Sequence, residues 1–327
     1  MHAYERPELR PAIEIIREAS LLAQEVRQTM AVSAMRKDDR TPVTVADYAV
    51  QAVVARALGR EGSPVPLVAE ESGAALRKPE SAELMKIVVD VVRRRVPDAS
   101  SQTVMDWIDR GTSECGERFW TLDPIDGTKG FLRGDHYAIA LALIERGNVI
   151  AGIIGCPTLD ADPVRATKGT GCLAVAASGA GAWVAPLAGG AWRRLAVSST
   201  TKPEDAVVLQ SFEGQHMDTS QADRILQGLG VSRPSVRMDS LAKFVVLAAG
   251  SGDLLWRLPT PDRPDYKESI WDQAAGHVMV EEAGGKVSDI DGRPLDFSCG
   301  KKLRNNRGVL ASNGTLHQRF LDAVKAG

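Results

Sequence analysis

The sequence predicts a chain of two halves, an α+β half with a mainly antiparallel sheet followed by an α/β half. In the first half, two apolar runs at 137–144 and 149–154 are joined by a short segment containing Gly147, a pattern typical of a β-hairpin. Short strand-like runs separated by glycines continue to about residue 198. Strand-like and helix-like segments then alternate, which favours an α/β arrangement. We therefore expect two domains, residues 1–195 and residues 196–327.

Before the hairpin, the pattern predicts mostly helices. Residues 11–30 place apolar side chains close to a 3.6-residue period, with Pro11 suited to the first helical position. A polar loop at 33–43 precedes a second helix at 44–58, which Gly59 ends. The other expected elements are a strand at 66–69, helices at 79–95 and 101–110, and a strand at 119–122 that ends at Asp123.

In the second half, strands and helices are expected in turn. They are strands at 206–211, 253–258 and 308–312 and helices at 219–228, 240–250, 269–283 and 314–325. A G-x-G-x-x-A pattern at 169–174 raises the alternative of a dinucleotide-binding oxidoreductase. The residues after it indicate a strand and a glycine turn, whereas that motif requires a helix. We therefore reject the oxidoreductase hypothesis.

The composition excludes several classes of protein. The chain has 40 Lys and Arg against 42 Asp and Glu, so its formal charge of −2 provides no attraction to nucleic acid or to an anionic membrane. The four cysteines show neither CxxC spacing nor nearby paired histidines, which disfavours a zinc ribbon and a disulfide framework. We see no signal peptide and no membrane-spanning apolar run, and expect a cytoplasmic enzyme. The sequence leaves the oligomeric state open.

The segment Asp123-Pro-Ile-Asp-Gly-Thr128 is the strongest chemical signal. A strand delivers Asp123, and a turn allows Asp126 to place a second carboxylate beside it. Gly127 permits close backbone approach, and Thr128 opens a helical turn whose free N–H groups bind phosphate oxygens. The alternative is an Asp-rich turn with a helix cap, but a turn needs one Asp whereas a metal site uses two.

Three further acids each have an ordinary structural explanation when taken alone. Glu70 follows an apolar strand as a surface acid would, Asp47 completes a capping box with Thr44, and Asp272 lies in a first helical turn, where acids favour the helix dipole. Together with Asp123 and Asp126 they form a set of hard oxygen ligands without His or Cys, which suits Mg²⁺ or Mn²⁺ rather than zinc. Two or three such cations hold a phosphate and activate a water molecule.

Several segments resemble one enzyme family. They are TPVTVADYAVQ (41–51), LVAEESG (67–73), FWTLDPIDGTKGFLRGDHYAIAL (119–141), MDSLAKF (238–244), LWRLP (255–259) and WDQAAGHVMVEEAGG (271–285). Through them the chain resembles the lithium-sensitive, magnesium-dependent phosphatases of the inositol monophosphatase superfamily, and residues 129–135 are similar to its 3′(2′),5′-bisphosphate nucleotidases. The resemblance implies an α-β-α-β-α sandwich with an antiparallel sheet in the N-terminal half and a mixed sheet in the C-terminal half, with metals in a cleft.

The resemblance also implies the metal ligands. Glu70, Asp123 and the Ile125 carbonyl would bind a first Mg²⁺, and Asp123, Asp126 and Asp272 a second. Glu70 would support a third ion through water.

The same resemblance implies the catalytic and phosphate-binding groups. Asp47 and Thr128 would take the proton from the attacking water, and the amides of Gly127 and Thr128 would bind the phosphate. The N-terminal half would thus carry most of the catalytic machinery.

The nucleotide contacts implied by the resemblance lie in the C-terminal half. Ser240, Lys243 and Arg257 would contact the nucleotide and its other phosphate, and His216, in the loosely matching segment 213–221, is the candidate on the adenine side. The implied substrate is 3′-phosphoadenosine 5′-phosphate, with its sulfated form, 3′-phosphoadenosine 5′-phosphosulfate, as a second, which suggests a role in sulfur assimilation. The alternatives are inositol polyphosphate 1-phosphatase or inositol monophosphatase activity, and a non-catalytic metal- or nucleotide-binding protein of this fold.

Overall fold

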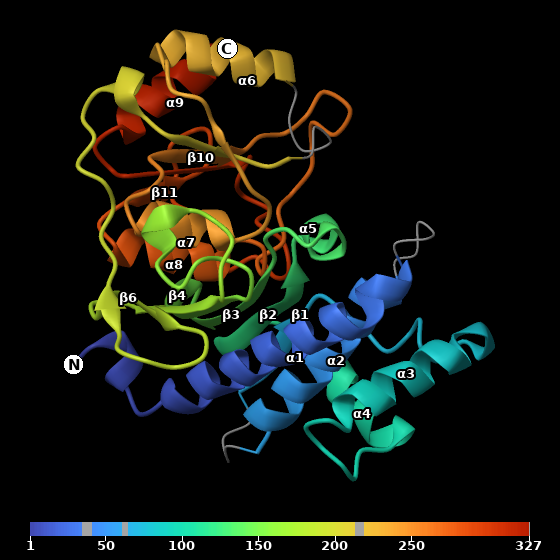
Figure 1. Ribbon diagram of the computed structural model, residues 1–327. Coiled ribbons are helices and arrows are strands. Elements are labelled where there is room, and N and C mark those ends of the chain that lie inside the picture. Colours follow the sequence, from blue (N-terminus) through green and yellow to red (C-terminus); the bar gives the residue numbers. More distant parts are fainter. Residues whose placement is uncertain (35–40, 61–64, 213–218, 327) are drawn as a thin grey trace.

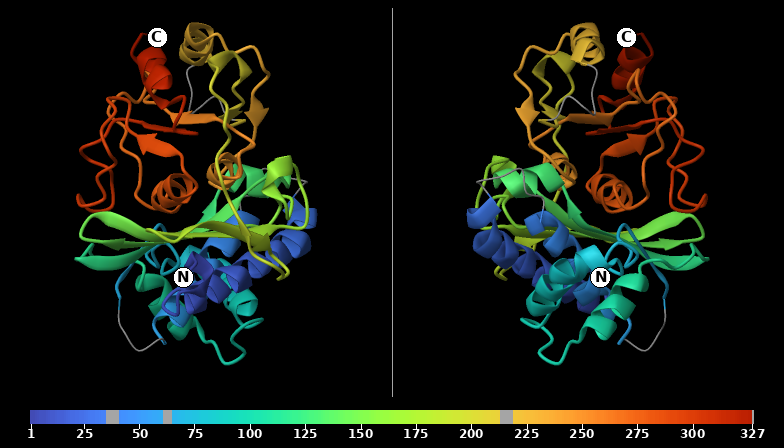
Figure 2. Two further views of the ribbon diagram at one scale, coloured as in Figure 1. Left: turned by 90° about the vertical axis from the view of Figure 1, so that its left-hand side faces the viewer. Right: turned by 90° about the vertical axis from the view of Figure 1, so that its right-hand side faces the viewer.

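The computed structural model describes residues 1–34, 41–60, 65–212 and 219–326, which form stacked layers of helices and sheets (Figures 1 and 2). One face of the first sheet is covered by α1 and α2, and the other by α7 and α8. The second sheet follows, and α6 and α9 pack together beyond it. This arrangement confirms the expected α-β-α-β-α sandwich. The helices are α1 (Arg10–Ala34), α2 (Thr41–Leu58), α3 (Ala82–Val92), α4 (Ser101–Asp109), α5 (Thr128–Arg133), α6 (Thr219–Leu229), α7 (Ala242–Ala248), α8 (Ala274–Glu282) and α9 (His317–Ala326).

The first sheet has seven strands in chain order, and all neighbours are antiparallel except β1 and β2, which are parallel. The strands are β1 (Leu67–Ala69), β2 (Arg118–Asp126), β3 (Ala138–Glu145), β4 (Asn148–Cys156), β5 (Cys172–Ala177), β6 (Gly181–Pro186) and β7 (Arg193–Arg194). Arg146 and Gly147, both with positive φ, connect β3 to β4 in the predicted hairpin. The G-x-G-x-x-A pattern at 169–174 runs into β5 and then β6 rather than into a helix, so the rejection of a dinucleotide-binding motif is confirmed.

The second sheet is mixed and has five strands in the order β11-β12-β10-β8-β9. Its members are β8 (Val208–Gln210), β9 (Val236–Arg237), β10 (Leu254–Arg257), β11 (Lys286–Ser288) and β12 (Val309–Ser312). The strand β8 is parallel to β9 and β10, whereas β12 is antiparallel to both of its neighbours. The sequence did not predict β9 and β11, because two or three residues are too few to show an alternating pattern.

A shared apolar core joins the two sheets. The same buried cluster contains Ile154 of β4, Ala275 of α8 and Leu255 of β10. Gly152 of β4 lets α8 approach the first sheet, because a Cβ there would lie 2.9 Å from the Cα of Ala275. The first sheet ends at Arg194 and the second begins at Val208, but a domain boundary at residue 195 stays a prediction.

Several boundaries differ from expectation, and those nearest the predicted site matter most. The helix α1 extends to Ala34 and α2 begins at Thr41, so the predicted loop at 33–43 is wrong at both ends. Pro42 fits the first turn of α2, which puts Thr44 inside the helix and makes the capping-box explanation of Asp47 wrong. The strand β2 continues past Asp123, and α8 begins only at Ala274.

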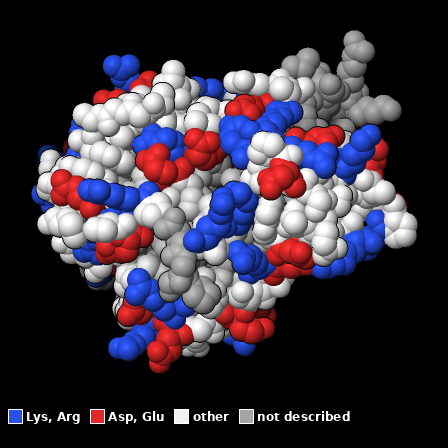
Figure 3. Space-filling view, turned by 90° about the horizontal axis from the view of Figure 1, so that it is seen from below, with Lys and Arg blue, Asp and Glu red and all other residues white. Residues whose placement is uncertain are grey.

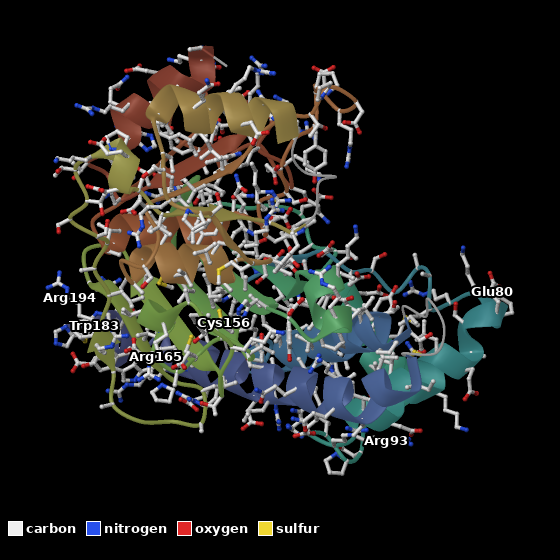
Figure 4. The ribbon with its side chains drawn as sticks, turned by 45° about the horizontal axis from the view of Figure 1, so that its top comes forward. Glu80, Arg93, Cys156, Arg165, Trp183 and Arg194 are labelled. Carbon is white, nitrogen blue, oxygen red and sulfur yellow. The ribbon has the colours of Figure 1, made fainter. Side chains whose placement is uncertain are left out.

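The surface and the cysteines agree with an ordinary globular chain. On the face shown in Figure 3, acidic and basic side chains are interspersed rather than segregated. The four cysteines are free thiols, and Cys156 lies inside the molecule (Figure 4). Within the described helices, none combines the length and the apolar character needed to cross a membrane.

Candidate active site

A cavity of about 400 Å³ lies where β1, β2 and α5 meet α7 and β10. Its wall contains nearly all the described residues that the sequence suggested for chemistry. These are Glu70, Asp123, Ile125, Asp126, Gly127, Thr128, Ser240, Lys243, Arg257 and Asp272. Segments separated by up to 200 residues in the sequence therefore meet in one place.

A β-bulge explains how Asp123 and Asp126 reach the same cavity. In a regular strand, residues three apart point to opposite faces of the sheet. On β2, however, Asp123 is opposite Ala140 and Asp126 is opposite Ala138, so the register shifts between the two acids. The extra residue turns Asp126 toward the side that Asp123 faces, and both line the cavity.

Gly127 joins this strand to the C-terminal half of the chain. Its φ of 88° lies in the left-handed region, and a Cβ there would be 2.8 Å from the Cβ of Ser240. Immediately before it, Asp126 accepts a hydrogen bond from the backbone N–H of Leu241. The glycine therefore lets the motif pack closely against the segment that leads into α7, and Thr128 begins α5 as predicted.

Glu70 and Asp272 arrive from separate elements. Glu70 follows β1, whose parallel pairing with β2 brings the carboxyl ends of both strands to one edge of the sheet. Its backbone N–H donates to the carbonyl of Leu122 over 3.3 Å. Asp272 lies in the turn before α8 rather than in its first helical turn, so the helix-dipole explanation of this acid is wrong.

The four carboxylates lie close enough to repel one another, and Asp123 is the buried member of the group. Burial and the charges of Asp272 and Asp126 raise the pKa of Glu70 to about 8. Burial also raises the pKa of Asp272 to about 7, although Arg257 opposes this shift. The pKa of Asp123 is raised by burial and then by Glu70, Asp126 and Asp272. Such a group of acids favours an added cation strongly.

One oxygen atom shows the same need. Asp123 is 2% exposed, and its Oδ1 atom has no hydrogen-bond partner. A buried carboxylate oxygen without a partner costs free energy, and a hard divalent cation would remove that cost. Among the described residues, however, no three His, Cys, Asp or Glu side chains stand close enough together to hold an ion. The carboxylate oxygens of the cavity wall are nevertheless the kind of donor that Mg²⁺ prefers.

Asp47 stands behind the cavity rather than on its wall. It lies on α2, which packs against α5. Burial raises the pKa of its carboxyl, and the charges of Glu71 and Glu70 raise it further. The sequence missed Glu71, which adds negative charge at this point although its position directly after Glu70 was visible.

Lys243 and Arg257 face the acids from the other half of the chain. Lys243 is 7% exposed, and its Nζ donates to the Ser211 hydroxyl over 3.1 Å and to the Met238 carbonyl over 3.3 Å. Burial lowers the pKa of Lys243 to about 8. Arg257 forms an ion pair of 3.2 Å with Glu268. The cavity thus brings four acids together with a buried lysine and a half-buried arginine.

Other wall residues were not predicted. They are Lys129, Gly130, Leu132, Gln210, Ser211, Asp239, Trp256 and Tyr266. Gln210 ends β8 and Ser211 follows it, at the carboxyl end of a strand in a parallel pair; this position often carries ligand-binding groups and could have been noticed. His216 lies outside the described residues.

Comparison with known proteins gives a consistent result. The sequence model of the inositol monophosphatase family matches residues 5–326 of this chain. The chain belongs to the inositol monophosphatase family. It is 38% identical to a 3′(2′),5′-bisphosphate nucleotidase of Emericella nidulans over 95% of each chain, and 39% identical to a 3′(2′),5′-bisphosphate nucleotidase of Oryza sativa over 97% of this chain and 93% of that one. An inositol monophosphatase structure from Anabaena shares the fold, with a TM-score of 0.61 and 23% identity over 98% of this chain and 97% of the other.

Proposed function

We propose that this protein is a metal-dependent phosphatase that removes the 3′-phosphate of 3′-phosphoadenosine 5′-phosphate, giving AMP and phosphate. One observation carries the proposal: four acids from distant segments line one cavity together with Lys243 and Arg257. The names of relatives that match nearly the whole chain support a nucleotide carrying two phosphates as the substrate.

Glu70, Asp123, Asp126, Asp272 and the Ile125 carbonyl would hold the Mg²⁺ ions, and Mn²⁺ suits the same oxygen donors. When bound, these ions supply positive charge for the reacting phosphate and lower the pKa of a bound water molecule. The buried, partnerless Oδ1 of Asp123 supports this assignment.

The chain's own groups would position the substrate and move one proton. The amides of Gly127 and Thr128 would bind oxygens of the phosphate that is cleaved, while Asp47 and Thr128 would accept the proton of the attacking water. Most of the rate enhancement would come from positioning and charge neutralisation, as in phosphoryl transfer generally.

The second phosphate would be bound in the C-terminal half. A bisphosphate carries an additional anionic group, and Lys243 and Arg257 are cations of the cavity wall that would bind it. Ser240 would add a hydroxyl at the same wall.

Phosphate release tests this proposal. We expect turnover of adenosine 3′,5′-bisphosphate with Mg²⁺, loss of turnover with EDTA, and recovery when excess Mg²⁺ is added. Inositol 1,4-bisphosphate and inositol 1-phosphate should turn over more slowly in the same assay. Faster release from an inositol phosphate would favour the inositol phosphatase alternative. Binding of the bisphosphate without any release would favour the non-catalytic one.

Several finer points stay predictions. They are inhibition by lithium, use of 3′-phosphoadenosine 5′-phosphosulfate as a second substrate, a role in sulfur assimilation and a cytoplasmic location. The first is checked by adding lithium to the same assay, and the second by supplying 3′-phosphoadenosine 5′-phosphosulfate in place of the bisphosphate.

A further inference from the structure

Phe212 is an exposed aromatic residue that directly follows two residues of the cavity wall. In the described part of the chain, the large hydrophobic side chains that are exposed are Met1, Val164 and Phe212. Phe212 is 45% exposed and directly follows Gln210 and Ser211, which line the cavity. Single exposed apolar residues are common, so its exposure alone indicates nothing. Its surroundings are what distinguish it.

Charged groups fix the position of this ring. The backbone N–H of Phe212 donates to Oδ1 of Asp239 over 3.2 Å, and Asp239 itself lines the cavity and is 6% exposed. The other carboxylate oxygen of Asp239 forms an ion pair with Arg133. The guanidinium of Arg133 lies over the Phe212 ring, 5.3 Å from its centroid, and pairs with Asp135 over 3.0 Å. Phe212 is therefore oriented by an acid and an arginine although it is exposed.

The neighbouring residues connect this ring to the phosphate-binding wall. Lys243 donates to the hydroxyl of Ser211, the residue directly before Phe212. Asp126, among the acids, accepts a hydrogen bond from the backbone N–H of Leu241, two residues before Lys243. Contacts thus lead in order from a carboxylate group through a buried cation to an aromatic ring. That order parallels a nucleotide, with a cleaved phosphate, a second phosphate and a flat base.

The chemistry of the ring selects one kind of ligand group. Aromatic side chains and arginine planes stack on nucleobases, and this stacking depends on the flat face that every base has. An inositol phosphate has no such face. Because Phe212 is both accessible and fixed, stacking a base on it requires little further ordering of the side chain.

We infer that Phe212, oriented by Asp239 and Arg133, binds the nucleobase of the substrate by stacking and thereby determines specificity for nucleotides. This inference rests on the proposed function of the cavity. Asp239 and Arg133 are positioning residues, since they act on the base through Phe212.

The test compares a substrate that has a base with one that lacks it. Steady-state kinetics are measured on adenosine 3′,5′-bisphosphate and on 1-deoxyribose 3,5-bisphosphate for wild type, Phe212→Ala, Phe212→Leu and Phe212→Trp. In Phe212→Ala and Phe212→Leu, we expect KM for the nucleotide to rise about ten-fold, with kcat changed less than about two-fold. KM for the abasic compound should change less than about two-fold in these two variants. Phe212→Trp keeps an aromatic face, so its KM for the nucleotide should stay close to that of the wild type.

The leucine variant keeps an apolar side chain of similar size, so it separates loss of the aromatic face from loss of packing. Val164→Ala removes bulk from another exposed hydrophobic residue and should leave both KM values unchanged. Equal changes of KM for both compounds, or no change for either, would overturn the inference while leaving nucleotide hydrolysis by the wild type in place. If wild type releases phosphate from neither compound, the proposed function itself fails.

Discussion

The two walls of the cavity satisfy their charges in different ways. The acid wall, formed by Glu70, Asp123, Asp126 and Asp272, raises the pKa of each of its members and leaves the Oδ1 atom of Asp123 without a partner. On the cation wall, formed by Lys243 and Arg257, the ammonium donates to neutral oxygens and the guanidinium pairs with Glu268. The acid wall therefore needs cations from outside the chain, whereas the cation wall needs only the anionic substrate.

The largest effect is expected from a change in the acid wall. Asp123→Asn removes the negative charge of an acid that the resemblance assigns to two metal ions, so kcat should fall by about a thousand-fold or more. Phosphate release under saturating bisphosphate and Mg²⁺ measures this change. Asp90→Asn on α3 removes an exposed acid remote from the cavity wall and is the control. Turnover of Asp123→Asn within a few-fold of wild type would exclude the acid wall as the reacting site.

Changes in the cation wall should affect binding more than turnover. Lys243→Met and Arg257→Met each remove a charged hydrogen-bond donor, so KM for adenosine 3′,5′-bisphosphate should rise about 10- to 100-fold. KM for adenosine 3′-monophosphate, which lacks the second phosphate, should rise much less. Arg94→Met at an exposed site of the helical layer is the matched control. Equal increases for both substrates would contradict the assignment of the second phosphate to this wall.

Adding one methyl group at Gly127, where the motif contacts Ser240, should lower the stability of the protein. Gly127→Ala introduces a Cβ at a positive φ and within 2.8 Å of Ser240, and should lower the free energy of unfolding by about 2–4 kcal/mol. Gly179→Ala has a similar positive φ with no atom within 4 Å, so it should cost only about 1 kcal/mol. Urea denaturation measures both values. If the two variants lose the same stability, the close contact between the motif and Ser240 has no energetic role.

The smallest effect concerns pH. Since burial lowers the pKa of Lys243 to about 8, its ammonium loses its charge as the pH rises through this value. The charged form binds the anionic substrate, so KM for the bisphosphate should rise by up to about eight-fold between pH 7.5 and 9. Lys243→Arg keeps its charge in this range and should show a flat profile. A wild-type profile that matches the arginine variant would argue against a role for Lys243 in the pH response.

The site was more predictable than the boundaries around it. The motif from Asp123 to Thr128 is six consecutive residues, so its turn chemistry and paired acids predict a metal site from the sequence alone. The bulge that turns Asp126 into the cavity was not visible, because register depends on the partner strand. The start of α2 at Thr41 was missed because the polar residues before Thr44 resemble a loop.

The residues that were missed share one property. Asp239 and Ser211 line the cavity, and Glu268 pairs with Arg257 of its wall; each is an ordinary polar residue in the sequence. Their roles come from partners far along the chain, such as Arg133 for Asp239 and Arg257 for Glu268. Such pairings are set by the layered packing, which a single sequence does not encode in any local pattern.

Direct observation of the ions would test the central claim. Crystals grown with Mn²⁺, adenosine 5′-monophosphate and phosphate should show anomalous peaks at about 2.0–2.3 Å from oxygens of Asp123 and of at least one other acid of that wall. The wild-type structure should also show phosphate oxygens on the same ions. A cavity that stays free of anomalous signal at millimolar Mn²⁺, in crystals of active protein, would contradict the account.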